Sequence, residues 1–370
     1  MVEVRLSTFI NLAIFCEEKD PSSSGRLLAF SFCMRMNTKN EKYRIVWAVD
    51  PFAKSPKYQR SAVSVMNELA RSAPLEIIPI HVLAAGIAER LRSAPAETRL
   101  KIRHKGQSIV DGISGALSLQ ARPLYILPEK FSSLQGGATQ LLRFARKIHA
   151  DMIVLSTHAR KGAERWAIGS FAETLSTISD VPILIAPPSW SPSGKKKTIL
   201  FATDFSADSL AAFDRLLEMA VRQTWDITVF HQVNYPFYPA YDFAFETLAS
   251  YDGDLRELAA LMRKKAEKLV AKGKRIGVLV DISIYSSQRF SIADAILKEI
   301  RKKHLFIALA SQSSPLRNAF LGGPTRQLIR KSPVPIWVIH PEKISKETKV
   351  MADRDSKRRD LIQDGARTDL

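Results

Sequence analysis

The chain has 370 residues, 46% of them hydrophobic and 25% charged, which is typical of a soluble globular protein with room for two ordinary domains. Its net charge of +18 suits attraction to nucleic acid, anionic membranes or anionic metabolites, and it equally suits a solvated basic face without a partner. No apolar run approaches the roughly 20 residues that span a bilayer. The two cysteines, Cys16 and Cys33, precede the first domain, so a disulfide framework is excluded there and a reducing cytoplasm fits.

The first segment, residues 1–43, has no counterpart later in the chain. Its weakly apolar stretch LSTFINLAIF lacks the basic start of a secretory signal, and the polar stretch 20–25 is typical of disorder. We expect either a disordered extension or a translation start at Met34 or Met36.

Apolar runs alternate with helical patterns between residues 44 and 187. Five strands are expected there, at 45–49, 77–83, 123–127, 152–155 and 182–186. Helical spacing predicts four helical segments between them, near 62–70, 85–120, 141–148 and 169–178. The second of these segments is expected to be interrupted at Pro95 and Gly106.

A linker rich in Pro, Ser and Gly at 188–197 leads into a second region, 198–341, with the same alternation. Its five strands are expected near 199–203, 227–233, 277–285, 305–310 and 335–339. Its helices are expected near 207–222, 254–273, 291–303 and 323–331. The charged and polar tail, 342–370, predicts disorder or a frayed helix.

The two regions repeat the same motifs about 150 residues apart, which indicates a duplicated domain rather than a solenoid. IVWAVDPF in the first region corresponds to ILFATDFS in the second. Gly169 lies thirteen positions before Pro182, and Gly322 lies thirteen before Pro335. Unbroken apolar strands alternating with helices predict an α/β fold with two similar doubly wound domains. Each is expected to be a five-stranded parallel sheet with helices on both faces.

Ligands of such sheets bind beyond the carboxyl ends of the strands, and Asp50 and Asp204 directly follow the first strand of each domain. An acid there accepts hydrogen bonds from a base or a sugar, or it caps the following turn by the same chemistry. His81 and His231 end the second strands, where a structural hydrogen bond is a more common role than catalysis.

Gly169 and Ser170 open a helix after a loop, where free N–H groups and the helix dipole favour an anion. The alternative is a tight turn at Gly169 with Ser170 as the N-cap. His158, Arg160 and Lys161 precede this helix, either as phosphate contacts or as a solvated basic loop. No Ser–His–Asp set, carboxylate pair, metal-ligand spacing or Walker motif is present, so we expect neither turnover chemistry nor a metal.

Each domain resembles a universal stress protein domain, over about 44–187 and 198–341. The residues that carry the resemblance are the strand ends VD and TD, the strand ends HV and HQV, and the final block GSFAE followed by VPILI. The resemblance implies a stress-response role. It also implies pairing through the last strand, either between the two domains of this chain or in a homodimer.

ATP-binding members of this family carry a glycine, two residues, a second glycine, nine residues, and then glycine with Ser or Thr. Gly169 and Ser170 match the last pair, whereas the earlier glycine places fall on Ser156 and Ala159. A Cβ at those places stands where the backbone is expected to approach ribose and phosphate. The second domain departs further, because Gly323 follows Gly322.

The same resemblance makes Asp50 the acid that contacts adenine and Val82 a backbone contact. The damaged glycine pattern favours a dimerisation and protein-interaction module without turnover chemistry. The alternative is an ATP or adenine-nucleotide sensor, with a slow ATPase ranked last. Its expected ligand residues in the first domain are Asp50, Val82, Ser156, Ala159, Arg160, Gly169 and Ser170.

Six aromatic residues gather in the segment 235–246, directly after a strand of the second domain. The segment is either a flap packed on its own domain or a docking surface for another protein. Stacking on nucleobases is not favoured, because no RNA-binding motif accompanies the aromatic residues. We therefore expect protein partners or an adenine nucleotide rather than a nucleic acid or a membrane.

Overall fold

A computed structural model describes residues 42–52, 59–117, 120–128, 133–157, 170–192, 197–233, 246–286, 291–300, 304–311 and 323–340. The expectations for residues 1–41, for the aromatic residues of 235–245 and for the tail 342–370 fall outside these ranges. Among the helices within them, none has both the length and the apolar character needed to cross a membrane.

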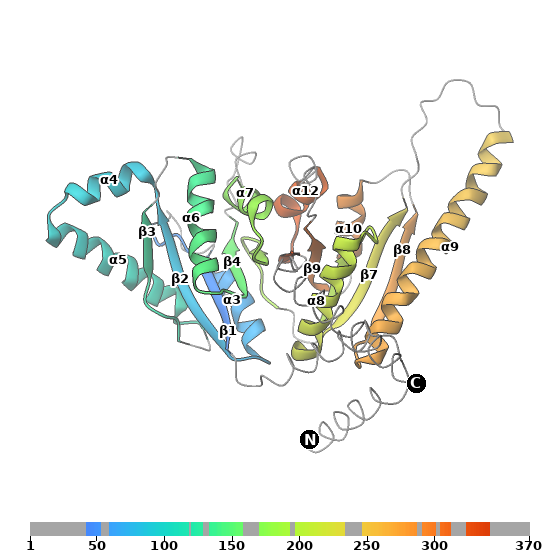
Figure 1. The fold of residues 1–370 in the computed structure, drawn as a ribbon, viewed down its shortest axis with the longest axis horizontal. Helices are drawn as coiled ribbons and strands as arrows, with labels where there is room; N and C mark the ends of the chain where they lie inside the picture. Colours follow the sequence, from blue (N-terminus) through green and yellow to red (C-terminus); the bar gives the residue numbers. More distant parts are fainter. Residues whose placement is uncertain are drawn as a thin grey trace, which may run out of the picture.

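Strands from both domains form one ten-stranded sheet in the described part of the chain (Figure 1). Its order is β3-β2-β1-β4-β5-β10-β9-β6-β7-β8. The first domain supplies β1 (Tyr43–Ala48), β2 (Leu75–Leu83), β3 (Tyr125–Pro128), β4 (Met152–Ser156) and β5 (Ile183–Ala186). The second supplies β6 (Thr198–Ala202), β7 (Asp226–Val233), β8 (Val280–Ser286), β9 (His304–Ala310) and β10 (Ile336–Ile339).

The two domains meet where β5 pairs with β10, and this pairing is antiparallel, with Leu184 opposite Trp337. Every other strand pair in the sheet is parallel. The predicted fold class is therefore confirmed, with one addition: the two five-stranded sheets continue into each other. The pairing through the last strand lies within the chain.

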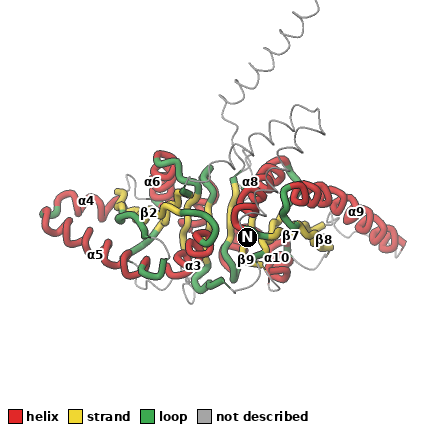
Figure 2. Tube along the Cα trace, turned by 90° about the horizontal axis from the view of Figure 1, so that it is seen from below, coloured by secondary structure: helices red, strands yellow, loops and turns green. Residues whose placement is uncertain are grey.

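Helices cover both faces of the sheet in each domain (Figure 2). One face packs against α3 (Gln59–Ala70), α5 (Ala96–Ser114), α8 (Ala207–Gln223) and α9 (Glu246–Arg275). The other face packs against α6 (Leu134–Lys147), α7 (Ser170–Ile178), α10 (Ile292–Ile300) and α12 (Gly323–Lys331). The helix α4 (Ala85–Ser93) lies with α5 beyond the β3 edge of the sheet, at the left of Figure 1.

Side chains at the end of α8 in the second domain also contact the first domain. The amide of Gln223, at the end of α8, donates to the carbonyl of Leu69 at 2.8 Å. The guanidinium of Arg222 lies 5.2 Å from the centre of the Tyr43 ring. Behind this contact, the buried ring of Trp225 packs edge-on against Phe306 at 5.4 Å. The contact between the domains therefore includes a buried hydrogen bond and a cation–π contact, next to an aromatic pair of the second domain.

The expected interruption at Gly106 is wrong, whereas the one at Pro95 is confirmed. Pro95 is the N-cap of α5, but α5 runs unbroken through Gly106. Gly106 is buried, and a Cβ added there lies 3.1 Å from Leu124 Cδ2 and 3.2 Å from Phe52 Cζ. The glycine is therefore a place of close packing within the helix rather than its end.

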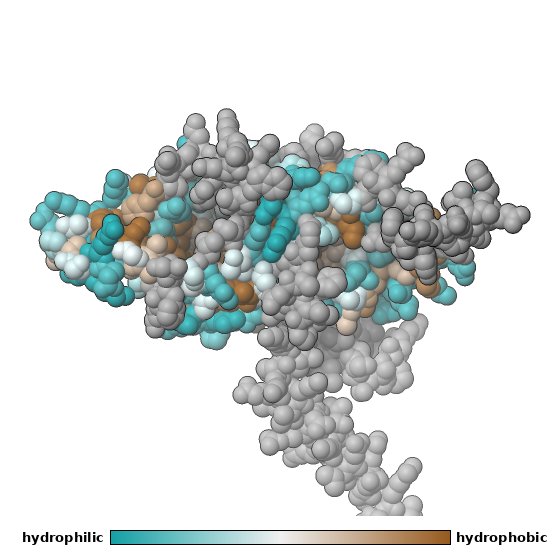
Figure 3. Space-filling model, turned by 90° about the horizontal axis from the view of Figure 1, so that it is seen from above, coloured by the Kyte–Doolittle hydropathy of each residue, from teal (hydrophilic) through white to brown (hydrophobic). Residues whose placement is uncertain are grey.

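The described surface is largely hydrophilic, and hydrophobic residues gather at the left end of the view in Figure 3. Near the β3 edge of the sheet, Ile87 of α4, Leu100 of α5 and Tyr125 of β3 are each about half exposed. They belong to the helical hairpin of α4 and α5 and to the strand beside it. At the opposite edge, among the residues that the structure describes, the long helix α9 borders β8 instead (Figure 1).

The close approach of α9 to β8 predicts a strong effect of one methyl group. A Cβ at Gly273 comes within 2.3 Å of Val280 Cγ2 and 2.9 Å of the Val278 carbonyl oxygen. Gly273→Ala is therefore expected to lower the free energy of unfolding by about 1–3 kcal/mol, measured by urea denaturation. The matched control is Gly112→Ala in α5, where nothing lies within 4 Å. That variant should gain about 0.5–1 kcal/mol from helix propensity. If Gly273→Ala and Gly112→Ala have equal free energies of unfolding, the close packing of α9 against β8 at Gly273 is wrong.

Candidate functional site

The strand order places a binding position in each domain. In the second domain, β6 lies between β9 and β7. The helix that follows β6, α8, packs on one face of the sheet, and the helix that follows β9, α12, packs on the other. The carboxyl ends of β6 and β9 diverge there, which is the position where open parallel sheets bind ligands. In the first domain, β1 and β4 create the same geometry.

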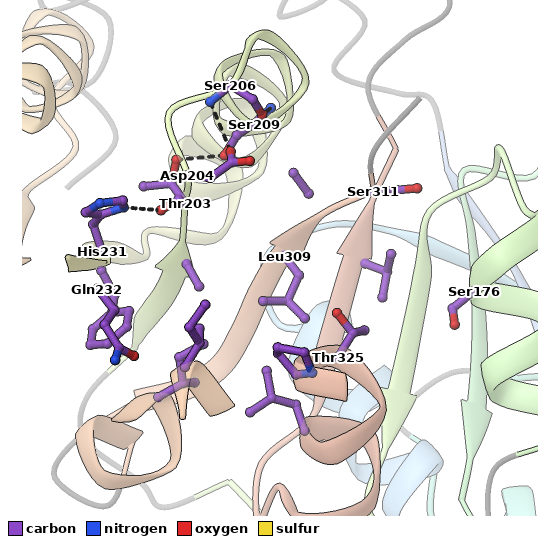
Figure 4. A pocket seen from close by; sticks show the side chains of 18 of the residues that line it. Ser176, Thr203, Asp204, Ser206, Ser209, His231, Gln232, Leu309, Ser311 and Thr325 are labelled. Atoms are coloured by element: carbon purple, nitrogen blue, oxygen red, sulfur yellow. Dashed lines mark hydrogen bonds between the residues drawn. The ribbon is translucent and has the colours of Figure 1, made fainter. Parts of the chain in front are cut away.

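A cavity of about 260 Å³ occupies this position in the second domain (Figure 4). Its apolar wall comes from strands and helices on one face of the sheet, and polar side chains stand around it. The apolar residues include Phe230, Ile292, Ile296, Leu309, Leu328 and Val338. The polar ones include Ser176, Thr177, Thr203, Asp204, Ser209, Gln232, Ser311 and Thr325. A small molecule with one flat apolar part and several polar groups matches this lining.

The turn after β6 fixes Asp204 at the cavity. Its Oδ1 accepts a hydrogen bond from the Ser206 amide at 3.0 Å, which is a capping interaction. The Thr203 hydroxyl lies 2.7 Å from the Ser209 hydroxyl, on the first turn of α8. Phe205, between them, has a φ of 59°, which is strained for this residue type. Asp204 is exposed, so its carboxylate faces whatever enters the cavity.

The first domain has the same aspartate contact, in a turn that carries Pro51 where the second domain has Phe205. Oδ1 of Asp50 accepts a hydrogen bond from the Phe52 amide at 3.1 Å. The ring of His81 lies 5.3 Å from that of Phe52, just as His231 lies 5.0 Å from Phe205. The capping role that the sequence left open for Asp50 and Asp204 is therefore present in both domains.

Three of the residues predicted to bind nucleotide end neighbouring strands of the first domain or follow them. Asp50 follows β1, Val82 lies near the end of β2, and Ser156 ends β4. The Ser156 hydroxyl is buried and has no hydrogen-bond partner in the part of the chain that the structure describes. Ser170 begins α7. Ala159, Arg160 and Gly169 lie outside the described residues, so the assembly of this site stays a prediction.

The cavity of the second domain was not predicted as the main site. Asp204 was noted, but Gln232, Ser311 and Thr325 were not. Ser311 directly follows β9, so the rule that selected Asp204 also applies to it. Thr325 lies inside α12 and reaches the cavity only because that helix packs over the sheet, which the local pattern does not indicate.

The environment of His81 disfavours its charged form. Burial lowers the pKa of the His81 imidazole, while the Asp50 carboxylate and the Val49 carbonyl act to raise it. The Nδ1 atom lies 3.2 Å from the Val49 oxygen and 3.8 Å from Asp50 Oδ1. Because burial outweighs the two attractions, the pKa stays below its ordinary value and the neutral ring is favoured.

Comparison with known proteins agrees with this architecture. The family model described as the universal stress protein family matches residues 43–187 and again residues 196–340. The chain belongs to the universal stress protein family. No curated protein matches the chain.

The first two of three solved structures, with TM-scores above 0.5, show the same fold over most of this chain. A universal stress protein from Archaeoglobus fulgidus has 13% identity and a TM-score of 0.51, covering 82% of this chain and 98% of its own. A protein of unknown function from Pseudomonas aeruginosa has 10% identity and a TM-score of 0.52, covering 86% and 99%. An Arabidopsis thaliana family protein solved with AMP bound has 18% identity and a TM-score of 0.28, covering 40% and 94%.

The lowered pKa of His81 predicts a pH-dependent stability. Below about pH 6.5 the unfolded chain binds a proton at this ring more readily than the folded protein does, so acidification favours unfolding. Stability is therefore expected to fall between about pH 7 and pH 5, and His81→Gln should make this dependence shallower. Urea denaturation at several pH values measures it. An NMR titration in which His81 protonates at or above the ordinary histidine pKa contradicts the prediction.

Proposed function

We propose that this universal stress protein is a stress-response regulator that binds an adenine nucleotide in its second domain and carries out no turnover chemistry. The observation that supports it most is the cavity at the carboxyl ends of β6 and β9. The cavity combines an apolar wall with Asp204 and several hydroxyl groups, and it lies at the ligand position of this sheet type.

The lining suits each part of such a ligand. Phe230, Ile296 and Leu309 offer apolar surface for a flat base, and Asp204 is an acceptor for an exocyclic amino group. The hydroxyl of Ser311 can bond a ribose. Thr325 lies in the first turn of α12, where backbone N–H groups and the helix dipole favour a phosphate.

One oxygen of Asp204 and one ring nitrogen of His231 are engaged in structural contacts, which supports binding rather than catalysis. Asp204 accepts the Ser206 amide, and His231 Nδ1 lies 2.7 Å from the Thr203 carbonyl oxygen. A general base needs its acceptor atom within reach of the substrate proton. We therefore include the absence of turnover in the proposal, as the sequence also predicts.

A protein-interaction module is the second candidate function. Its support is the antiparallel pairing of β5 with β10, which occupies within one chain the strands through which family members pair. A partner protein must then use another surface, and the aromatic segment 235–246 is the one that the sequence suggests. A homodimer through the last strands is not part of this proposal.

Calorimetric titration of the protein with AMP and ATP, after a check for nucleotide carried through purification, tests nucleotide binding. We expect one site per chain. Asp204→Asn should weaken binding by roughly tenfold or more, because a charged acceptor is lost while the Asn side chain still caps the turn. Asp50→Asn is the matched control, since it makes the same change in the same turn of the first domain.

The outcomes separate the candidates. If Asp50→Asn weakens binding and Asp204→Asn does not, the nucleotide site lies in the first domain, as the sequence predicted. If the unaltered protein shows no heat of binding with AMP or ATP and carries no nucleotide through purification, the proposal of nucleotide binding is wrong. The protein-interaction module then remains as the candidate function.

A further inference from the structure

A cluster of three charged residues joins the two domains beside the cavity. Glu173 lies on α7 of the first domain and is only 14% exposed. Its Oε1 accepts a hydrogen bond from Nε of Arg330 at 2.9 Å, and its Oε2 lies 3.8 Å from Nε of Arg326. Both arginines belong to α12 of the second domain, so one carboxylate holds two positions of that helix, which stands next to α7 in Figure 1.

The helix that Glu173 holds is also a wall of the cavity. Thr325 and Leu328 of α12 line it: Thr325 directly precedes Arg326, and Leu328 lies between Arg326 and Arg330. On its other flank, α12 is tied to α10, because the Gln327 amide donates to Asp294 Oδ1 at 2.8 Å. A short helix held on two sides changes the shape of the cavity if either tie is lost.

The first domain reaches the cavity directly as well. Ser176 and Thr177 of α7 contribute to its lining, although the rest of the described lining belongs to the second domain. Their hydroxyls bond back to the Glu173 carbonyl at 2.9 and 2.8 Å, which sets their orientation within α7. The ligand position of the second domain is therefore completed by a helix of the first.

The charges of the cluster fit only the tandem arrangement. Counting from Gly169 and Gly322, Glu173 and Arg326 occupy the same position in their domains. In this chain the two positions meet as opposite charges. Two copies of the first domain paired in the same way bring two carboxylates together, and two copies of the second bring two guanidinium groups together, both of which are unfavourable.

We propose that Glu173 is a positioning residue for the second-domain cavity, acting through Arg326 and Arg330 on α12. Ligand binding in the cavity and the contact between the domains are then coupled. A ligand that stabilises α12 strengthens the contact between the domains, and loss of that contact lowers the affinity for the ligand by the same factor. This coupling rests on the proposed function, because it concerns the same cavity.

The test is AMP titration of the full chain and three variants. Glu173→Gln is expected to lower the affinity for AMP by about fivefold, which is the lower end of typical coupling between two sites. The charge reversal Glu173→Arg with Arg326→Glu and Arg330→Glu keeps opposite charges at both contacts of the cluster, and this swap should restore most of the affinity. Asp180→Asn is the matched control, because it removes an ion pair with Arg146 within the first domain, away from the cavity. Unchanged affinity in Glu173→Gln, or no rescue by the swap, overturns the coupling.

Hydrogen exchange without ligand tests the positioning step independently of the proposed function. Amides of α12 should exchange faster in Glu173→Gln than in the unaltered protein or in Asp180→Asn. If α12 exchanges alike in all three, Glu173 does not position it. If α12 loosens while the unaltered protein binds no AMP, the proposed function and the coupling to a nucleotide are wrong, and the positioning of α12 stands.

Discussion

The antiparallel pairing of β5 with β10 is the contact on which the rest of the structure depends. It joins two parallel sheets, aligns the apolar residues of both domains on the same two faces, and brings α7 beside α12. Leu184 and Trp337, directly opposite each other, belong to one core cluster that also contains Trp47 and Phe201. The duplicated domain thus becomes one folded body, whose ligand position is built by both copies.

The two copies keep the same aspartate contact but have diverged around it. After β1 and β6 an aspartate accepts a hydrogen bond from the amide two residues later, although the residue between them is Pro51 in one copy and Phe205, with a φ of 59°, in the other. The helices at the seam differ, because Ala172 of α7 is buried where the second domain has Thr325 in its cavity lining. The copies therefore share their framework and differ in the residues at the helices that meet between them.

Much of the fold follows from the sequence, because buried parallel strands read as unbroken apolar runs. β4 was expected at 152–155 and spans Met152–Ser156. β3 was expected at 123–127 and spans Tyr125–Pro128, because an edge strand is partly exposed and its apolar run is weak. Gly106 was misread because close packing against Leu124 is a tertiary contact. The cavity was missed for the same reason, since Thr325 and Ser176 reach it from different domains.

The connection between the domains is anchored as well as short. Trp190, just after β5, is buried and packs 5.6 Å from Phe306 of β9. A covalent link that holds its partner in place keeps the effective concentration of the second domain far above that of any free protein. A separate single-domain protein of this fold is therefore expected to compete poorly for β5 or β10. The fused chain is protected from subunit exchange, and its two domains always remain in equal amounts.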